Sequence, residues 1–257
     1  HTIGEAVGYR LDSYKSCGKD TTDVTLKIES NCLSVTAVNW QAIDTVFLDM
    51  DGTLLDLQFD NEFWLRTIPN EYARRQTITV EAAKAYLEPI FIGEAGKLNW
   101  YCLDFWSRTL GFNVVKLKEQ VSHGINWRPE AREFLERLKA SHCDVVLITN
   151  AHPETLRVKL ERVNLTPWFD QVYSSHEFGE PKESQLFWER LQSARPFAPD
   201  RSLFIDDSES VLASAEHFGI KHLITLRQPD SQGPIRLVTQ YPAILHFDEI
   251  YHGLADS

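Results

Sequence analysis

The stretch Phe47-Leu-Asp-Met-Asp-Gly-Thr-Leu-Leu55 places two carboxylates, Asp49 and Asp51, after a short apolar run and around a turn that contains glycine. Residues 45–49 form a β-branched and apolar run that ends in an acid, which is typical of a buried parallel strand. In open α/β sheets, ligands bind beyond the carboxyl ends of the strands. We therefore expect both carboxylates to lie in a ligand site.

Similar runs recur farther along the chain and alternate with helical patterns. Pro129 and Pro153 mark the starts of two predicted helices, while Ser208 is predicted to cap a third helix that Gly219 ends. This alternation predicts an α/β fold with a Rossmann-like, mostly parallel sheet and helices on both faces. The further strands are predicted at residues 144–149, 171–173, 202–206 and 222–226, and the helices at 130–140, 154–163 and 209–218.

A long insertion separates the first two strands. Asp49 and Thr149 lie 100 residues apart, whereas a β–α–β unit needs only about 30 residues. The excess predicts a second, smaller helical domain with helical patterns at residues 81–91 and 99–111. The predicted division is a poorly ordered extension at 1–39, a core domain at 40–57 and 128–257, and the inserted domain at 58–127.

Composition excludes several classes of protein. The chain has 257 residues, and 37 acidic against 26 basic residues give a net charge of −11, which argues against binding to a nucleic acid polymer or an anionic membrane. It contains no apolar run of about 18 residues that would span a bilayer. Its four cysteines are widely spaced without C-x-x-C, and its nine histidines form no H-x-x-x-H pair, so we expect neither a disulfide scaffold nor a zinc site. A reducing, cytoplasmic location fits this pattern and the absence of a signal-peptide pattern.

Further polar residues follow the later strands. Thr149 ends the second strand, Lys182 lies in Gly179-Glu-Pro-Lys182, and Asp206 and Asp207 end the strand at 202–206. All these ends should meet at one edge of the sheet. With the first pair they bring four carboxylates together, and such a cluster needs a divalent cation to offset its repulsion. Oxygen-only ligands favour Mg²⁺.

This ordered set resembles the haloacid dehalogenase superfamily of phosphotransferases. The first motif, D-x-D-G-T, is residues 49–53, and the second, third and fourth motifs are Thr149, Lys182 and Asp206-Asp207. The resemblance spans about residues 43–226, with the insertion at the place where the family has a type-1 helical cap. It implies that the inserted domain is a cap over the site.

The resemblance also implies roles for individual residues. Mg²⁺ would be held by the side chains of Asp49 and Asp206 and by the backbone carbonyl of Asp51. Asp49 would attack phosphorus to form an aspartyl-phosphate, and Asp51 would protonate the leaving alcohol and then activate water. Branches of the family that cleave carbon–halogen or carbon–phosphorus bonds lack an acid at the position of Asp51. Its presence therefore implies phosphomonoester hydrolysis or phosphomutase transfer.

Four more motif residues complete the implied site. Thr149 and Lys182 would neutralise the non-bridging phosphoryl oxygens, a stabilisation that grows with the charge of the transition state. Asp207 and Asn150 would support the site, Asp207 through water or by orienting its neighbours.

The cap is expected to select the substrate, because it closes over the leaving group. A single helix at 99–111 would put Trp100, Leu103 and Asp104 on roughly one face, where an aromatic ring can stack on a base and an acid can accept from a purine. Alternatively, the aromatic residues form the core of the cap itself. The candidate substrate residues are Asp60, Asn61, Trp64, Asn99, Trp100, Asp104 and His152.

Within the superfamily, the chain is most similar to bacterial purine 5′-nucleotidases that act on GMP and IMP. The stretches that carry this resemblance reach into the cap, and they include Leu98-Asn-Trp-Tyr-Cys-Leu-Asp104, Thr149-Asn-Ala-His-Pro153 and Phe204-Ile-Asp-Asp-Ser-Glu209. The resemblance implies release of phosphate from a purine mononucleotide. The alternatives are a phosphatase of sugar phosphates or phosphoglycolate, a phosphomutase, and a phosphate-binding protein without activity.

Overall fold

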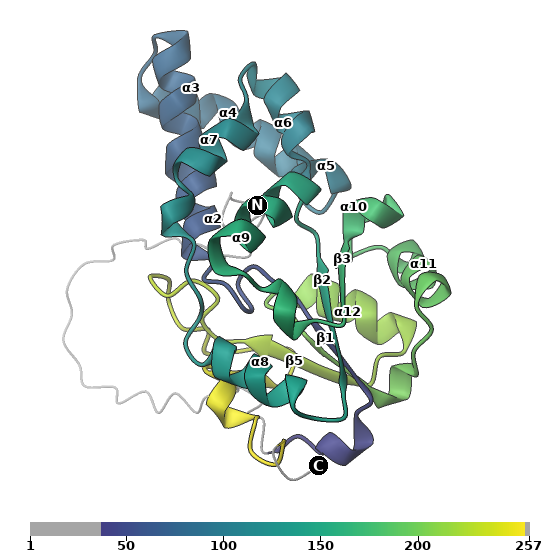
Figure 1. The fold of residues 1–257 in the computed structure, drawn as a ribbon. Helices are drawn as coiled ribbons and strands as arrows, with labels where there is room; N and C mark the ends of the chain where they lie inside the picture. The colour runs from purple at the N-terminus through teal and green to yellow at the C-terminus, as the bar shows by residue number, and fades with distance from the viewer. Residues whose placement is uncertain (1–36, 255–257) are drawn as a thin grey trace, which may run out of the picture.

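The computed structural model describes residues 37–254, so the prediction for residues 1–39 falls almost wholly outside the described part of the chain. Six parallel strands form one sheet in the order β3-β2-β1-β4-β5-β6 (Figure 1). This arrangement confirms the predicted α/β fold with a parallel sheet. The strands are β1 Thr45–Leu48, β2 Asp144–Thr149, β3 Gln171–Ser174, β4 Ser202–Ile205, β5 His222–Leu226 and β6 Ala243–Ile244.

The register of the central strands brings the polar strand ends together. β1 lies between β2 and β4, and Leu48 at its end is paired with Leu147 on one side and Ile205 on the other. The next residues along β1 and β4 are Asp49 and Asp206. Both carboxylates therefore emerge at the same edge of the sheet, as the sequence predicted.

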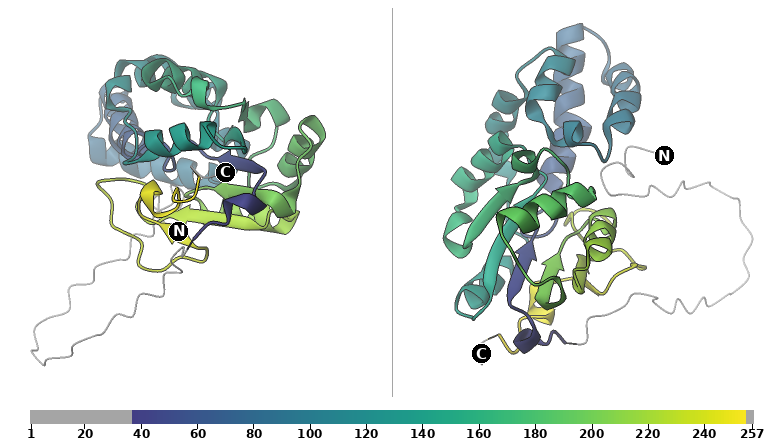
Figure 2. Two further views of the ribbon diagram at one scale, coloured as in Figure 1. Left: turned by 60° about the horizontal axis from the view of Figure 1, so that its bottom comes forward. Right: turned by 90° about the vertical axis from the view of Figure 1, so that its right-hand side faces the viewer.

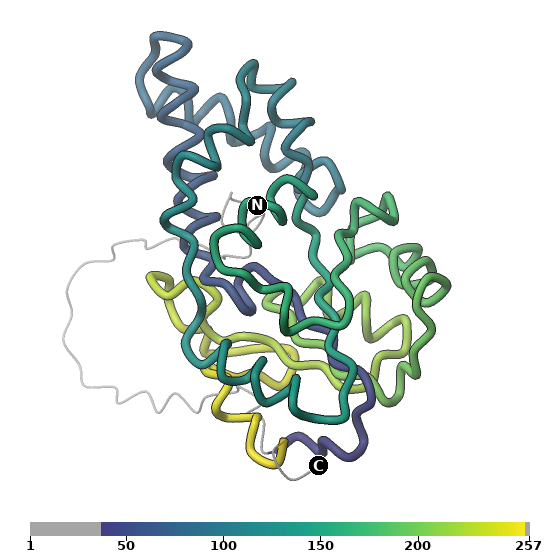
Figure 3. Tube along the Cα trace, viewed as in Figure 1, coloured from purple at the N-terminus to yellow at the C-terminus, as the bar shows by residue number. Residues whose placement is uncertain are grey.

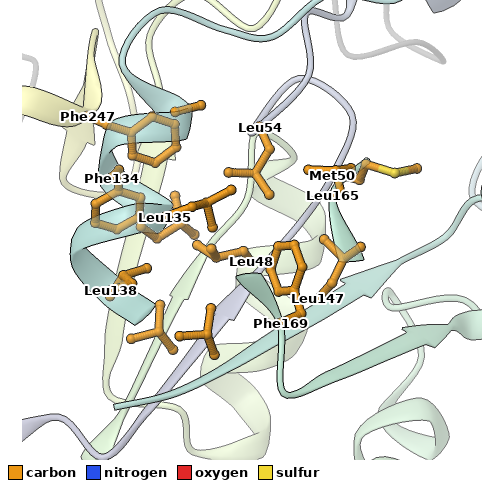
Figure 4. Packing of buried hydrophobic residues seen from close by; sticks show 14 of the residues in the cluster. Leu48, Met50, Leu54, Phe134, Leu135, Leu138, Leu147, Leu165, Phe169 and Phe247 are labelled. Carbon is orange, nitrogen blue, oxygen red and sulfur yellow. The ribbon is translucent and has the colours of Figure 1, made fainter. Parts of the chain in front are cut away.

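Helices pack on both faces of this sheet, as the two views in Figure 2 show. Successive residues of a strand point to opposite faces, and Leu48 joins the apolar cluster under α8 and α9, whereas Phe47 joins the cluster under α11 and α12. Figure 4 shows Leu48 beside Leu135 of α8 and Leu147 beside Phe169 in the first cluster. The core helices are α8 Ala131–Lys139, α9 Pro153–Val163, α10 Ser175–Phe178, α11 Gln185–Ala194 and α12 Glu209–Phe218.

The helix N-cap predicted at Ser208 differs in detail from the one in the structure. Ser208 occupies the N-cap position of α12, but its hydroxyl lies 2.9 Å from Ser210 Oγ and does not cap the helix backbone. The backbone N–H of Ser208 instead donates to Asp206 Oδ1 at 2.8 Å. The backbone at the start of α12 therefore donates a hydrogen bond to the acid that follows β4.

The inserted segment is entirely helical among its regular elements. The helix predicted at 81–91 lies within α4, but the single helix predicted at 99–111 is wrong. The chain becomes extended at Cys102 (φ −86°, ψ 106°), and Cys102 Sγ accepts a hydrogen bond from the N–H of Phe105, which starts a new helix. The elements are α2 Gln58–Glu62, a π-helical turn at Phe63–Thr67, α3 Ile68–Gln76, α4 Val80–Glu94, α5 Leu98–Tyr101, α6 Leu103–Leu110 and α7 Val114–Gln120.

Aromatic side chains form the core of this inserted segment, residues 58–127, which we call the cap. The rings of Trp64, Phe91, Trp100 and Trp106 lie in mutual contact, with centroids 5.2–6.0 Å apart. Trp64 and Trp100 are each only 8% exposed. Trp64 and Trp100 therefore belong to the core of the cap, which is the alternative that the sequence left open for its aromatic residues.

The cap joins the core through two chain segments that pair with each other. Leu55 and Trp127 form an antiparallel bridge. The N–H of Asp56 donates to Asn126 O and the N–H of Arg128 donates to Leu54 O, both at 2.9 Å. Figure 3 traces the chain up into the cap and back down to α8. Within residues 37–254, no helix is both long and apolar enough to cross a membrane.

Short 3₁₀ helices complete the description of the chain. They are η1 Trp40–Ala42, η3 Ser122–Gly124, η4 Thr166–Trp168, η5 Pro199–Arg201 and η6 Phe247–Glu249.

Candidate active site

A buried lysine lies between two buried acids at the carboxyl edge of the sheet. Lys182 Nζ is 2.5 Å from Asp49 Oδ1 and 2.6 Å from Asp206 Oδ2, and it also donates to Ile148 O at 3.3 Å. Thr149 ends β2 beside them and is buried as well. The motif residues that lie far apart in the sequence thus share one site.

Three carboxylates at this edge could hold a metal ion. One oxygen from each of Asp49, Asp206 and Asp207 lies within 4.8 Å of the others. Burial raises the pKa of Asp49 to about 6, although Lys182 opposes the shift. Burial likewise raises the pKa of Asp206, and burial with the nearby acids Asp206 and Asp49 raises that of Asp207 well above its usual value. The repulsion among the three carboxylates is therefore not fully offset by Lys182, and their hard oxygen donors fit Mg²⁺.

Gly52 is required by the backbone beside this cluster. Its φ is +82°, and a Cβ at this position would lie 2.6 Å from Asp207 Cγ. Non-glycine residues rarely adopt such a φ. Gly52 therefore lets the first motif turn closely past Asp207, whose carbonyl oxygen accepts a hydrogen bond from Arg236 at 2.6 Å.

The second acid of the first motif turns away from the carboxylate cluster. Asp51 Oδ1 lies 2.5 Å from Lys159 Nζ, and the same nitrogen lies 2.5 Å from Asp60 Oδ2. Lys118 of the cap pairs with the other oxygen of Asp60 at 2.8 Å. This chain of alternating charges links α2 and α7 of the cap to α9 of the core.

The two acids in this chain have opposite pKa shifts. Burial raises the pKa of Asp51 to about 6 against the pull of Lys159. Burial would also raise the pKa of Asp60, but Lys118 and Lys159 outweigh it and lower the pKa to about 2. Asp51 can therefore exchange a proton near neutral pH, whereas Asp60 is a fixed negative charge.

Asn150 and Glu183 connect the site to the cap. Asn150 Oδ1 accepts from the N–H of Lys182 at 2.9 Å, and its Nδ2 donates to Glu183 Oε2 at 3.0 Å. Tyr101 of α5 donates its hydroxyl to Glu183 Oε1 at 2.8 Å. Burial and Glu183 raise the pKa of Tyr101 well above its usual value, so the phenol stays a donor.

The predicted substrate residues of the cap are scattered. Trp100 and Leu103 are buried in the cap core, whereas the side chain of Asp104 is 66% exposed, so the prediction that the three share a helical face is wrong. The physical reason is the break of the helix at Cys102. Asn99 is exposed on α5.

Three other candidates lie near the junction of cap and core. Both oxygens of Asp60 are engaged by lysines, and Asn61 Nδ2 donates to Asp230 Oδ2 at 2.7 Å. His152 Nε2 lies 3.8 Å from Asp104 Oδ2. A role for these residues in binding substrate stays a prediction.

Sequence reasoning missed Lys159, Lys118, Glu183 and Tyr101. Lys159 lies between Val158 and Leu160 in α9, where nothing in the helical pattern marks it as a buried cation. Its signal is three-dimensional, since its two acidic partners come from the first motif and from the entrance of the cap.

The comparison with protein sequences agrees with this geometry. A family model described as haloacid dehalogenase-like hydrolase matches residues 43–219. The chain is 40% identical over 207 residues to GMP/IMP nucleotidase YrfG of Escherichia coli (strain K12), a match that covers 80% of this chain and 93% of that relative.

The comparison with solved structures agrees as well. A HAD phosphatase from Thermococcus onnurineus superposes with a TM-score of 0.66 at 19% identity, covering 80% of this chain and 95% of the other. The HAD-hydrolase YfnB from Bacillus subtilis, bound to magnesium, gives 0.54 at 19% identity and covers 82% and 98%. At these identities the two structures show the shared fold.

Proposed function

Because the chain belongs to the haloacid dehalogenase-like hydrolases, we propose that it is a Mg²⁺-dependent phosphatase of purine mononucleotides such as GMP and IMP. The observation that carries this proposal is that the two acids of the first motif, Asp49 and Asp51, contact different partners. Asp49 lies with Asp206 beside Lys182, while Asp51 lies apart on Lys159. A nucleophile and a proton carrier would thus have separate cationic partners, Lys182 and Lys159, so that each carboxylate is positioned for its own step.

Asp49, Asp206 and Asp207 would hold the Mg²⁺, with the backbone carbonyl of Asp51 as a further oxygen donor. The ion would supply positive charge that offsets the acids and the phosphate oxygens. Lys182 adds a fixed positive charge, since Asp206 and Asp49 outweigh burial and raise its pKa. Thr149 supplies a hydroxyl at the end of β2.

The reaction proceeds in two displacements. In the first, a carboxylate oxygen of Asp49 bonds to phosphorus, the phosphorus–ester oxygen bond breaks, and Asp51 gives its proton to the leaving alkoxide. In the second, Asp51 takes a proton from water, the water oxygen bonds to phosphorus, and the bond to Asp49 breaks. The sum is one ester and one water converted to one alcohol and one phosphate.

The purine substrate is supported by the relative that is 40% identical over 80% of this chain, whose name is that of a GMP/IMP nucleotidase. The stretch 98–104, which carried the resemblance in the sequence, supplies Tyr101 and Asp104 at the junction with the core. The cytoplasmic location stays a prediction.

The test measures phosphate release from GMP, IMP, AMP, a sugar phosphate and phosphoglycolate, with Mg²⁺ or with EDTA. We expect the purine nucleotides to have the highest kcat/KM, and both EDTA and Asp49→Asn to abolish turnover. Full activity in EDTA or in Asp49→Asn would refute the mechanism. Equal kcat/KM for GMP and the small phosphates would refute the purine assignment and leave the chemistry in place.

A further inference from the structure

A second group of metal-binding side chains lies where the cap meets the core. The group is Cys102, His152 and His176, and one ligand atom from each lies within 4.8 Å of the others. Cys102 lies between α5 and α6 of the cap, His152 is the N-cap residue of α9, and His176 lies in α10. None of them belongs to the carboxylate cluster of the active site.

His176 presents an available lone pair to this group. Its Nε2 is buried and has no hydrogen-bond partner among the described residues. The backbone of Asn150 also lies within hydrogen-bonding reach of the ring. Metal-bound histidines usually donate their other ring N–H to a neighbour such as a backbone carbonyl. Burial and His152 lower the pKa of His176 to about 4, which keeps the ring neutral.

The other two side chains are also suited to a metal. Cys102 Sγ accepts a hydrogen bond from the N–H of Phe105 at 3.4 Å, at the start of α6, and a cysteine sulfur is a preferred zinc ligand. Burial lowers the pKa of His152, so this ring is neutral too. Its Nδ1 accepts a long hydrogen bond of 3.3 Å from the N–H of Glu154. When Nε2 binds a metal, the ring proton lies on Nδ1, so this one hydrogen bond is lost.

We propose that Cys102, His152 and His176 bind one borderline-soft divalent cation such as Zn²⁺, which ties the cap to the core. One sulfur and two imidazole nitrogens favour zinc, whereas the oxygens of the catalytic cluster favour magnesium. The fourth position is open to water or to Asp104, whose carboxylate lies 3.8 Å from His152 Nε2.

A bound ion would join the cap to the core. One ligand, Cys102, belongs to the cap, and the two histidines belong to the core. An ion held by all three would therefore restrict movement of the cap relative to the core. This site escapes sequence inspection because its ligands come from three separate segments and match no local zinc spacing.

The test uses Co²⁺ as a spectroscopic probe of the full chain, reduced, with Mg²⁺ in excess to occupy the carboxylates. We expect a thiolate-to-cobalt charge-transfer absorption that saturates at one Co²⁺ per chain and disappears when Zn²⁺ is added. Cys102→Ser should abolish it, and His176→Gln should weaken Co²⁺ binding at least tenfold. Zn²⁺ should also lower kcat in the parent protein and leave it unchanged in Cys102→Ser.

The controls are the other cysteines. Cys143→Ser removes a buried thiol elsewhere in the core, and a Cys17→Ser, Cys32→Ser double variant removes the two outside the described residues. Both should keep the absorption. The hydroxyl introduced by Cys102→Ser can still accept from the N–H of Phe105, so the start of α6 is kept, and circular dichroism checks that the variant is folded. Absence of the band in the parent protein, its survival in Cys102→Ser, or its loss in either control would overturn the proposal.

Discussion

Lys182 is the side chain that offsets the charge of the buried acids at the sheet edge. We expect Lys182→Met to lower kcat at least about 10²-fold, because the charge that would face the transferred phosphoryl group in the proposed mechanism is lost. It should also lower the free energy of unfolding by about 3–5 kcal/mol, because Asp49 and Asp206 stay buried without their partner. Urea unfolding and steady-state kinetics measure the two effects.

A surface lysine provides the matched control for this variant. Lys139 pairs with Asp170 at 2.7 Å, but both side chains are more than 40% exposed. Lys139→Met should therefore cost less than about 1 kcal/mol and leave kcat unchanged. Similar losses of stability in the two variants would contradict the role assigned to burial at Lys182.

Gly52 and Gly111 form a natural pair for testing the turn of the first motif. Both have a positive φ (+82° and +77°). A Cβ at Gly52 would meet Asp207, whereas a Cβ at Gly111 would meet no atom of residues 37–254 within 4 Å beyond its adjoining chain. Both alanine variants should lose about 1 kcal/mol or more from backbone strain. We expect only Gly52→Ala to lose activity, by at least tenfold, in an assay of phosphate release. Equal activity of the two variants would count against a requirement for close approach at Gly52.

For individual residues, the sequence predicts the positions of those that end a strand or directly follow one. Asp49, Thr149 and Asp206 are of this kind, because the parallel register aligns their strands. It does not predict the partners of Asp51 and Asp60, because Lys118 and Lys159 lie inside helices, and only the packing of the cap on the core shows that they are buried.

Among the elements, α2, α7 and α9 are joined by the charges around Asp60. We expect Asp60→Asn to lower the free energy of unfolding at pH 7 by about 3–5 kcal/mol, because Lys118 and Lys159 stay buried with a weaker partner. Urea unfolding of the parent and variant proteins gives this difference. Asp144→Asn is the control: Asp144 pairs with Arg195, but its own side chain is 63% exposed, so the change should cost less than about 1 kcal/mol.

The contribution of Asp60 also has a defined pH dependence. Its folded pKa is about 2, below the ordinary value of 3.8. A lowered acid pKa stabilises the folded state above the unfolded pKa, and the stabilisation is lost as the pH falls through the folded pKa. The gap between parent and Asp60→Asn should therefore be full at pH 5 and shrink toward pH 2. A gap that widens in acid would contradict the ion-paired state.

The elements with strong periodic patterns were predictable, and those set by tertiary contacts were not. β1, β2 and α12 follow from apolar runs or helical periodicity. The break between α5 and α6 depends on the Sγ of Cys102 capping a new helix, and local periodicity gives no sign of it. The two-residue β6 exists only because β5 offers it an edge to pair with.

At the scale of the molecule, the apolar core of residues 37–254 is divided into two clusters on the sheet and one in the cap. Trp106 and Trp188 are both fully buried, the first in the cap and the second on the sheet. Each alanine variant should cost about 3–5 kcal/mol locally. We expect Trp106→Ala to speed hydrogen exchange in α3–α7 and Trp188→Ala to speed it in the sheet. Loss of protection throughout the chain in Trp106→Ala would show that cap and core unfold as one unit.

The paired segments at Leu55 and Trp127 make the cap an exchangeable module. Because the segment leaves and re-enters the core at adjacent positions, a short hairpin turn could replace it without altering any neighbour in the sheet. A different insertion could be grafted at the same two positions while Asp49, Asp206 and Lys182 keep their places. Under the proposed function, selectivity for the leaving group could therefore diversify by substitution of a whole segment, provided that a new segment again supplies an acid to Lys159, as Asp60 does.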